Sequence, residues 1–243
     1  MSVYVLIHGS WHGGWCWEKV VQSLKRARHK VEAPDLPGHG NDKTPISEIS
    51  LQSYADRICR LLDAQSEPVT LVGHSMGGVA ISQAAEHRPD KIKTLVYLTG
   101  NLVRNDESLF QVAQEDKESL VPPNLVVREE QGVSTIREDA VEDIFYNDCS
   151  EEDVACARSL LHPEPLAPLI TRISVTEENF GRVPRVYIEC LRDRANSPSA
   201  QKRMYTALPC QRVVSMNTGH SPFFSAPEEL VAHLSRCEHL NGA

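Results

Sequence analysis

Short apolar runs bounded by turn residues alternate with amphipathic stretches along the first hundred residues of the chain. The apolar runs have the length of buried strands, and the amphipathic stretches between them have the pattern of helices. We therefore predict strands at residues 3–7, 30–33, 69–72 and 93–98, and helices at 15–27 and 51–62. Alternation of this kind is typical of an α/β fold, in which helices cover both faces of a mostly parallel central sheet.

The pattern changes between residues 104 and 180. This stretch is polar, contains five prolines and carries one clear helical segment at 151–161, which Ser150 opens as N-cap. Strands return at 185–190 and 210–215, and a helix at 227–237 begins with proline. We predict a core made of residues 1–103 and 181–243, with an inserted cap at 104–180.

Composition narrows the function classes. A chain of 243 residues is near the upper limit of what one hydrophobic core supports, and its net charge of −8 with no long basic run argues against nucleic acid as a partner. No apolar stretch is long enough to span a membrane, and the chain begins as a strand rather than as a signal peptide. The seven cysteines lack metal-ligand spacing. We expect a cytoplasmic protein without a metal or cofactor, and the sequence leaves a homodimer open.

The strongest chemical signal is the segment Gly73-His74-Ser75-Met76-Gly77. It is a G-x-S-x-G motif placed between a predicted strand and a predicted helix, which is the context of a nucleophile elbow. The flanking glycines remove side chains that would clash in the tight turn. The motif therefore predicts Ser75 as a nucleophile, against the alternative of a glycine-flanked serine in an ordinary loop.

A serine hydroxyl needs a base and an acid that orients the base. His220 lies in a loop between the last predicted strand and the last helix, where the Ser–Asp–His order of this fold places the base. Asp193 follows the strand at 185–190 and is our candidate acid. Glu189 is the rival carboxylate, but it lies inside that strand, whereas sites of α/β sheets gather beyond the carboxyl ends.

A glycine-rich loop, His8 to Gly14, follows the first strand. Loops of this type supply backbone N–H groups to an oxyanion, and we assign that role to the N–H groups of Ser10 and Met76. The alternative is a tight turn without a ligand. Trp11 and His12 are expected to wall the pocket.

The sequence resembles the plant methylesterase and hydroxynitrile lyase group of α/β-hydrolases and related bacterial carboxylesterases over nearly its whole length. The likeness is carried by the loop from His8 to Trp17, the elbow at 73–78, the predicted cap stretches 149–153 and 159–163, and the stretch from 185 to 193. The resemblance implies an α/β-hydrolase fold and the triad of Ser75, Asp193 and His220.

Two positions separate the esterases of this group from the lyases. One class of lyases has a lysine directly after the catalytic histidine and a threonine in the first loop, and the opposite-handed class has an asparagine at that loop position. This chain has Ser221 and Gly9 there. It therefore lacks a cation for cyanide and a side chain for the cyanohydrin hydroxyl, which favours an esterase.

The sequence predicts a serine carboxylesterase that hydrolyses small carboxylic esters through an acyl-enzyme. A hydroxynitrile lyase or other lyase using the same triad is the alternative, and a hydrolase-fold receptor is a third reading that the intact triad disfavours. The expected partner is a small-molecule ester. Residues expected to contact it are Gly9, Trp11, His12, Phe145, Tyr146, Leu160, Leu161 and Phe223.

Overall fold

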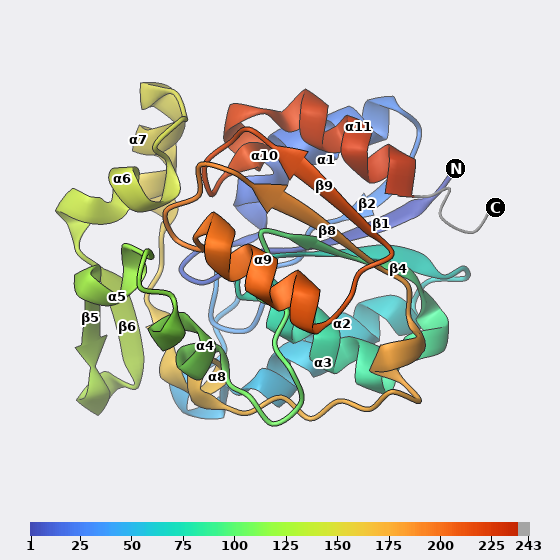
Figure 1. Ribbon diagram of the computed structural model, residues 1–243, viewed down its shortest axis with the longest axis horizontal. Helices are drawn as coiled ribbons and strands as arrows, with labels where there is room; N and C mark the ends of the chain where they lie inside the picture. Colours follow the sequence, from blue (N-terminus) through green and yellow to red (C-terminus); the bar gives the residue numbers. More distant parts are fainter. Residues whose placement is uncertain (238–243) are drawn as a thin grey trace.

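Six parallel strands form the centre of the computed structural model, which describes residues 1–237 (Figure 1). The strand order is β2-β1-β3-β4-β8-β9. Each strand is parallel to the strands beside it in the sheet. All carboxyl ends of the strands therefore lie at one edge of the sheet. The strands are β1 (Val3–Ile7), β2 (Lys30–Glu32), β3 (Val69–His74), β4 (Ile92–Leu98), β8 (Arg185–Cys190) and β9 (Arg212–Met216).

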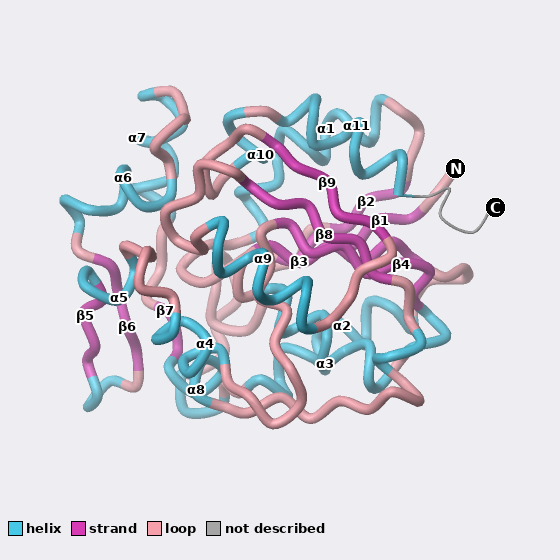
Figure 2. Tube along the Cα trace, in the orientation of Figure 1, coloured by secondary structure: helices cyan, strands magenta, loops and turns pink. Residues whose placement is uncertain are grey.

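Helices cover both faces of this sheet, as Figures 1 and 2 show. On one face α1 (Glu18–Arg26) packs with α11 (Pro227–Cys237), and on the other α2 (Leu51–Asp63) packs with α3 (Gly77–His87). α9 (Pro198–Ala207) contributes Met204 to the same core as α2 and α3. Each face has its own cluster of buried apolar side chains. Because β3 and β4 are buried on both faces, they consist of nearly continuous apolar residues.

Between β4 and β8 the chain leaves the central sheet, and we call residues 104–180 the cap segment. It contains a second sheet, antiparallel, in the order β5-β6-β7, which lies apart from the central strands in Figure 2. Short helices surround it. The elements are α4 (Leu109–Glu115), α5 (Val121–Asn124), β5 (Leu125–Arg128), β6 (Val133–Ile136), α6 (Val141–Phe145), α7 (Glu151–Leu160), β7 (Glu164–Pro165) and α8 (Leu166–Ile170).

The predicted fold class is confirmed, with differences in detail. The first predicted helix is divided into a 3-10 turn (Gly14–Trp17) and α1, and the predicted strand at 210–215 lies at Arg212–Met216. Ser150 caps α7 as expected, accepting a hydrogen bond from the Asp153 N–H. The small antiparallel sheet and four of the short cap helices were not predicted. Residues 238–243 of the predicted second core part lie outside the described residues.

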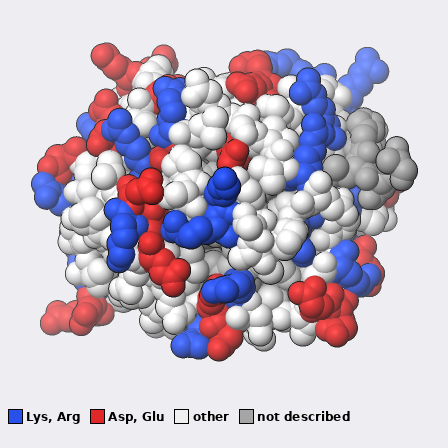
Figure 3. All heavy atoms as spheres, viewed as in Figure 1, with Lys and Arg blue, Asp and Glu red and all other residues white. Residues whose placement is uncertain are grey.

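The surface carries both signs of charge. Lysine and arginine side chains are interspersed with acidic ones over the face in Figure 3. Within the part of the chain that the structure describes, no helix is both long and apolar enough to cross a membrane.

Candidate active site

Ser75 sits at the sharp turn between β3 and α3. Its φ is +51°, in the left-handed region that non-glycine residues rarely adopt. A Cβ on Gly73 would lie 2.6 Å from the Gly77 carbonyl oxygen, and one on Gly77 would lie 2.7 Å from the His8 carbonyl oxygen. Both elbow glycines are therefore required for close packing of the strand, the turn and the helix.

Asp193 and His220 lie beyond the carboxyl ends of β8 and β9, and the structure brings them together. His220 Nδ1 is 2.7 Å from Asp193 Oδ2, and both side chains are buried. A carboxylate oxygen only accepts, so Nδ1 carries a proton, and in the neutral ring Nε2 keeps its lone pair. This is the tautomer that a general base requires.

Four donors converge on the Asp193 carboxylate. Besides His220, the Thr99 hydroxyl donates to Oδ2 at 2.6 Å, and the N–H groups of Ala195 and Asn196 donate to Oδ1 at 2.7 and 2.9 Å. These bonds fix the carboxylate plane and, through it, the imidazole. Thr99 was not predicted as a site residue, although its position directly after β4 at the carboxyl edge was a signal for it.

His220 lies close to the elbow. Its ring centroid is 4.5 Å from that of His74, the residue before Ser75, and 5.6 Å from that of Phe145. Phe145 lines the same cavity as Ser75. The His220 carbonyl oxygen accepts a hydrogen bond from His74 Nε2 at 2.9 Å, which ties the loop after β9 to the elbow.

Glu189, the rival acid, does not face this group. Its carboxylate accepts hydrogen bonds from the Ser215 hydroxyl at 2.6 Å and the Tyr205 hydroxyl at 3.1 Å. The structure therefore places Asp193, and not Glu189, against the imidazole.

The loop after β1 packs directly against Ser75. A Cβ on Gly9 would lie 2.7 Å from Ser75 Cβ and 3.0 Å from His74 Nδ1, so only glycine fits without displacing the elbow. Ser10 lines the cavity with Ser75. The N–H groups of Ser10 and Met76 make no hydrogen bond to other described residues, which leaves both donors available to a ligand.

His12 supports this loop from behind. Its Nδ1 donates to the Ser10 carbonyl oxygen at 2.7 Å, and its Nε2 accepts from the Tyr146 hydroxyl at 2.7 Å. Burial lowers the pKa of His12 to about 4, with His220 and His39 adding to the shift. The ring is therefore neutral at physiological pH, and in that form Nε2 has a lone pair with which to accept from the Tyr146 hydroxyl.

A cavity of about 90 Å³ opens beside Ser75 between the core and the cap segment. Asn101 and Asn196 line the same cavity as Ser75. The remaining wall is mainly apolar and is formed by α4, α5, β5, α8 and α9 through Leu109, Val112, Val121, Leu125, Leu169 and Met204.

Of the eight predicted contact residues, Gly9 packs against Ser75 and His12 lies behind the loop, and neither lines the cavity. The other six divide into three groups. Trp11 and Phe145 line this cavity, and Leu161 lines a neighbouring one that shares both of them. Tyr146 and Phe223 are buried behind the wall, where they pack with the loop and elbow histidines. Leu160 is 37% exposed and the structure does not bring it to the cavity.

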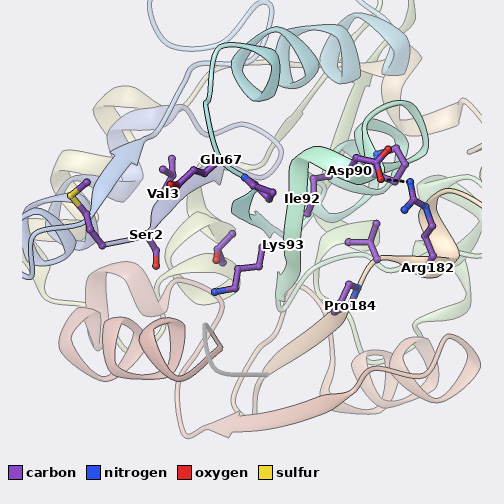
Figure 4. Close-up of a pocket in the computed structure, with 13 residues that line it drawn as sticks. Ser2, Val3, Glu67, Asp90, Ile92, Lys93, Arg182 and Pro184 are labelled. Carbon is purple, nitrogen blue, oxygen red and sulfur yellow. Dashed lines mark hydrogen bonds and ion pairs between the residues drawn. The ribbon is translucent and has the colours of Figure 1, made fainter. Parts of the chain in front are cut away.

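The opposite edge of the sheet carries a larger hollow of about 540 Å³, shown in Figure 4. It is lined by the starts of β1 and β4 and by the Asp90–Arg182 ion pair. Ser75, Asp193 and His220 do not line this hollow. Since ligand sites of parallel α/β sheets lie beyond the carboxyl ends of the strands, we place the functional site at Ser75.

Comparison with known proteins identifies the family of the chain. Residues 4–233 match the alpha/beta hydrolase family. The chain is 32% identical to methyl jasmonate esterase 1 of Vitis vinifera, covering 95% of this chain and 94% of that protein, and 32% identical to methylesterase 2 of Arabidopsis thaliana with the same coverage. Of the longer putative methylesterases 14, 11 and 15 of that plant, described as chloroplastic, it spans 69%, 61% and 54%.

Solved structures give the same result. A methylesterase from Arabidopsis superposes with a TM-score of 0.83 at 26% identity, covering 98% of both chains. A pyrethroid hydrolase from Sphingobium faniae superposes with a TM-score of 0.85 at 26% identity, covering 99% of this chain and 98% of that one. The elbow, the parallel sheet and these matches lead to one assignment. The chain belongs to the alpha/beta hydrolase family.

Proposed function

We propose that this protein is a serine carboxylesterase and that Ser75, His220 and Asp193 are its catalytic triad. The observation that carries the proposal is the 2.7 Å hydrogen bond from His220 Nδ1 to Asp193 beside a serine held in an elbow turn. Nε2 of His220 takes the proton as Ser75 Oγ attacks the ester carbonyl, and it returns that proton to the leaving alcohol. Water then hydrolyses the acyl-enzyme by the same route.

The oxyanion of each tetrahedral intermediate is stabilised by the N–H groups of Ser10 and Met76. Donors of this kind contribute about 2.7–4 kcal/mol of transition-state stabilisation each. Ser10 lines the same cavity as Ser75, and Met76 is the next residue in the chain. Neither N–H donates a hydrogen bond to another group within residues 1–237. The reaction needs only these groups and water.

The substrate is a small-molecule ester whose acyl part is short and apolar. A cavity of about 90 Å³ with a largely apolar wall supports this size and polarity. The cap segment forms much of the wall of this cavity through α4, α5, β5 and α8. A cytoplasmic location belongs to the same proposal, since the buried Cys16, Cys59 and Cys190 are thiols and not disulfides.

The test is Ser75→Ala assayed on a panel of esters in which acyl length and then alcohol bulk are varied. We expect wild type to prefer short acyl groups, and the variant to lose about 10⁴-fold or more in kcat because triad members act as a unit. A clean, folded variant that keeps more than a few per cent of wild-type kcat contradicts the nucleophile assignment.

Mandelonitrile assayed beside p-nitrophenyl acetate separates the esterase from the lyase alternative. Cyanide needs a neighbouring cation, yet the residue after His220 is the fully buried, uncharged Ser221. Gly9 has no space for a side chain that would orient a cyanohydrin hydroxyl. We expect ester hydrolysis without cyanohydrin cleavage, and Ser75-dependent cleavage of mandelonitrile by wild type would reverse the assignment.

A further inference from the structure

The cap segment contributes one fully buried carboxylate, that of Glu164, to the loop after β1. Oε2 of Glu164 accepts a hydrogen bond from the Trp11 N–H at 2.9 Å and lies 2.9 Å from His39 Nε2, while Oε1 accepts from the Tyr54 hydroxyl at 3.2 Å. Removing a carboxylate from water costs several kcal/mol, so it persists in an interior only where donors compensate it. Three donors from three separate core elements do so here.

His39 supplies the countercharge. Its Nδ1 lies 3.1 Å from the Pro37 carbonyl oxygen and its Nε2 faces Glu164, so both ring nitrogens face acceptors and the imidazolium satisfies both. Burial acts to lower the pKa of His39, but the charge and hydrogen bond of Glu164, together with the Pro37 carbonyl and the Asp35 charge, outweigh it and raise the pKa. The two side chains therefore form a buried ion pair between core and cap.

Trp11 is the residue that this pair holds. Its φ of +62° is a left-handed conformation that costs about 1–3 kcal/mol in a non-glycine residue and persists only when its surroundings enforce it. The cap segment provides three hydrogen bonds for this. Besides Glu164, the Ser134 carbonyl oxygen accepts from Trp11 Nε1 at 3.1 Å, and the His162 N–H donates to the Trp11 carbonyl oxygen at 2.8 Å.

These contacts come from one place in the cap. Ser134 and Glu164 are paired residues of β6 and β7, so a single rung of the small sheet faces Trp11. On the other side of the same peptide group, the Ser10 carbonyl oxygen accepts from His12 Nδ1. The peptide bond between Ser10 and Trp11 is thus fixed at its oxygen by the core and at its N–H by the cap.

We propose that Glu164 is a positioning residue for the oxyanion site. By holding the Trp11 N–H, it fixes the Ser10–Trp11 peptide and so restrains the backbone at Ser10, the residue whose own N–H donor the transition state requires and substrate binding does not. The inference rests on the proposed function, because it matters only if an oxyanion forms at Ser75.

The test is Glu164→Gln, with Glu130→Gln as its control. Glu130 is exposed beside the same small sheet, so its substitution makes the same charge change away from Trp11. A glutamine at 164 has one acceptor oxygen for three donors and directs its own N–H groups at another donor. We expect kcat to fall about tenfold with KM changed less than threefold, and Glu130→Gln to behave as wild type.

Two inhibitors separate positioning from a general structural role. Ser75 Oγ adds to the carbonyl carbon of a trifluoromethyl ketone, its proton passes to His220 Nε2, and the resulting hemiketal oxyanion occupies the site. The matching methyl ketone binds without this addition. We expect Glu164→Gln to lower the affinity for the trifluoromethyl ketone in proportion to its loss of kcat, and to leave the affinity for the methyl ketone within about twofold of wild type. Equal weakening of both inhibitors, or of neither, overturns the proposal.

A second variant and a reference variant complete the experiment. Tyr54→Phe removes one donor from Glu164 and keeps the carboxylate, so it remains informative if Glu164→Gln does not fold. We expect a smaller loss in the same direction, and an unchanged ratio of the two inhibitor affinities overturns the proposal. Ser75→Ala is measured alongside. Retained turnover in Ser75→Ala overturns the proposed function, whereas an inactive Ser75→Ala with an unchanged inhibitor ratio in Glu164→Gln overturns only the role of Glu164.

Discussion

The core and the cap segment contribute to the candidate site in different ways. The core provides every side chain of the proposed chemistry, since Ser75, Asp193 and His220 follow β3, β8 and β9 at one edge of the parallel sheet. The cap segment provides none of them. Its polar side chains instead bond to the backbone and supporting side chains of the core loops that carry the proposed oxyanion donors and triad.

Three cap carboxylates each accept a hydrogen bond from a core N–H. Asp116 Oδ2 accepts from Ser197 at 2.9 Å, Asp148 Oδ2 from Gly219 at 2.7 Å, and Glu164 Oε2 from Trp11 at 2.9 Å. The three donors, Ser197, Gly219 and Trp11, lie within four residues of Asp193, His220 and Ser10 respectively, in three different loops. The proposed reacting groups therefore all come from the core, whereas the cap holds the backbone around them. We expect substitutions of the proposed reacting groups to abolish turnover, and substitutions of these three cap carboxylates to reduce it by degrees.

Apart from replacement of the nucleophile itself, we expect Asp193→Asn to cause the largest loss of kcat. An amide at this position cannot accept from His220 Nδ1 and all three further donors, so the imidazole loses its tautomer and orientation. We expect kcat to fall about 10³- to 10⁴-fold. Glu189→Gln is the matched control in the same region, and it should stay within about twofold of wild type. A larger loss for Glu189→Gln would reverse the assignment of the acid.

Gly9→Ala tests how tightly the loop after β1 packs under the elbow. The added Cβ would lie 2.7 Å from Ser75 Cβ, so the serine has to move. We expect kcat on p-nitrophenyl acetate to fall about 10- to 100-fold, since small displacements of reacting groups have effects of this size. Gly132→Ala is the control, because it adds strain at φ +66° in the cap. It should lower the unfolding midpoint without lowering kcat.

The buried histidine beneath Ser10 makes stability depend on pH. The pKa of His12 is about 4 in the folded chain and near 6.5 when unfolded, so between these values the unfolded state binds the extra proton and stability falls as pH falls. At pH 5 this contribution is about 2 kcal/mol of lost stability relative to pH 7. When the free energy of unfolding is measured in urea at both pH values, the loss between pH 7 and pH 5 should be about 2 kcal/mol smaller in His12→Gln than in wild type. Equal losses in the two proteins would exclude His12 as the source.

Asp148→Asn should have the smallest effect of the series. It weakens the hydrogen bond from the Gly219 N–H and the ion pair with Arg192, but it leaves the triad in place. We expect a three- to tenfold lower kcat, in line with the loss of a charge-assisted hydrogen bond. Asp139→Asn removes an exposed cap carboxylate and should leave kcat unchanged. An effect as large as that of Asp193→Asn would contradict the division between core and cap.

The core was predictable from the sequence because its elements are long and periodic. The predicted bounds of β1, β8 and α11 match the structure to the residue, and the triad candidates follow from a motif and from chain order. The roles of Ser75, Asp193 and His220 remain predictions until the variants are measured. Their placement at one sheet edge is what a parallel topology imposes.

The cap was less predictable for a physical reason. Its strands have two to four residues, which is too short for a period to be visible, and Glu164 lies between two prolines in what resembles a loop. His39 lies between two glycines in what the sequence indicates is a turn, yet its side chain is buried against that carboxylate. Whether a charge is solvated or paired depends on which distant segments meet, and the sequence around Glu164 and His39 gives no sign of that meeting.

Labelling with paraoxon tests the central claim, that Ser75 is the nucleophile, most directly. Attack of Ser75 Oγ on phosphorus releases p-nitrophenolate and leaves a diethylphosphoryl group on the serine. Mass spectrometry of the digested protein should find one such group per chain on the peptide that contains Ser75, with ester turnover lost in proportion to labelling. A label on another residue, or complete labelling of Ser75 with turnover retained, would contradict the account.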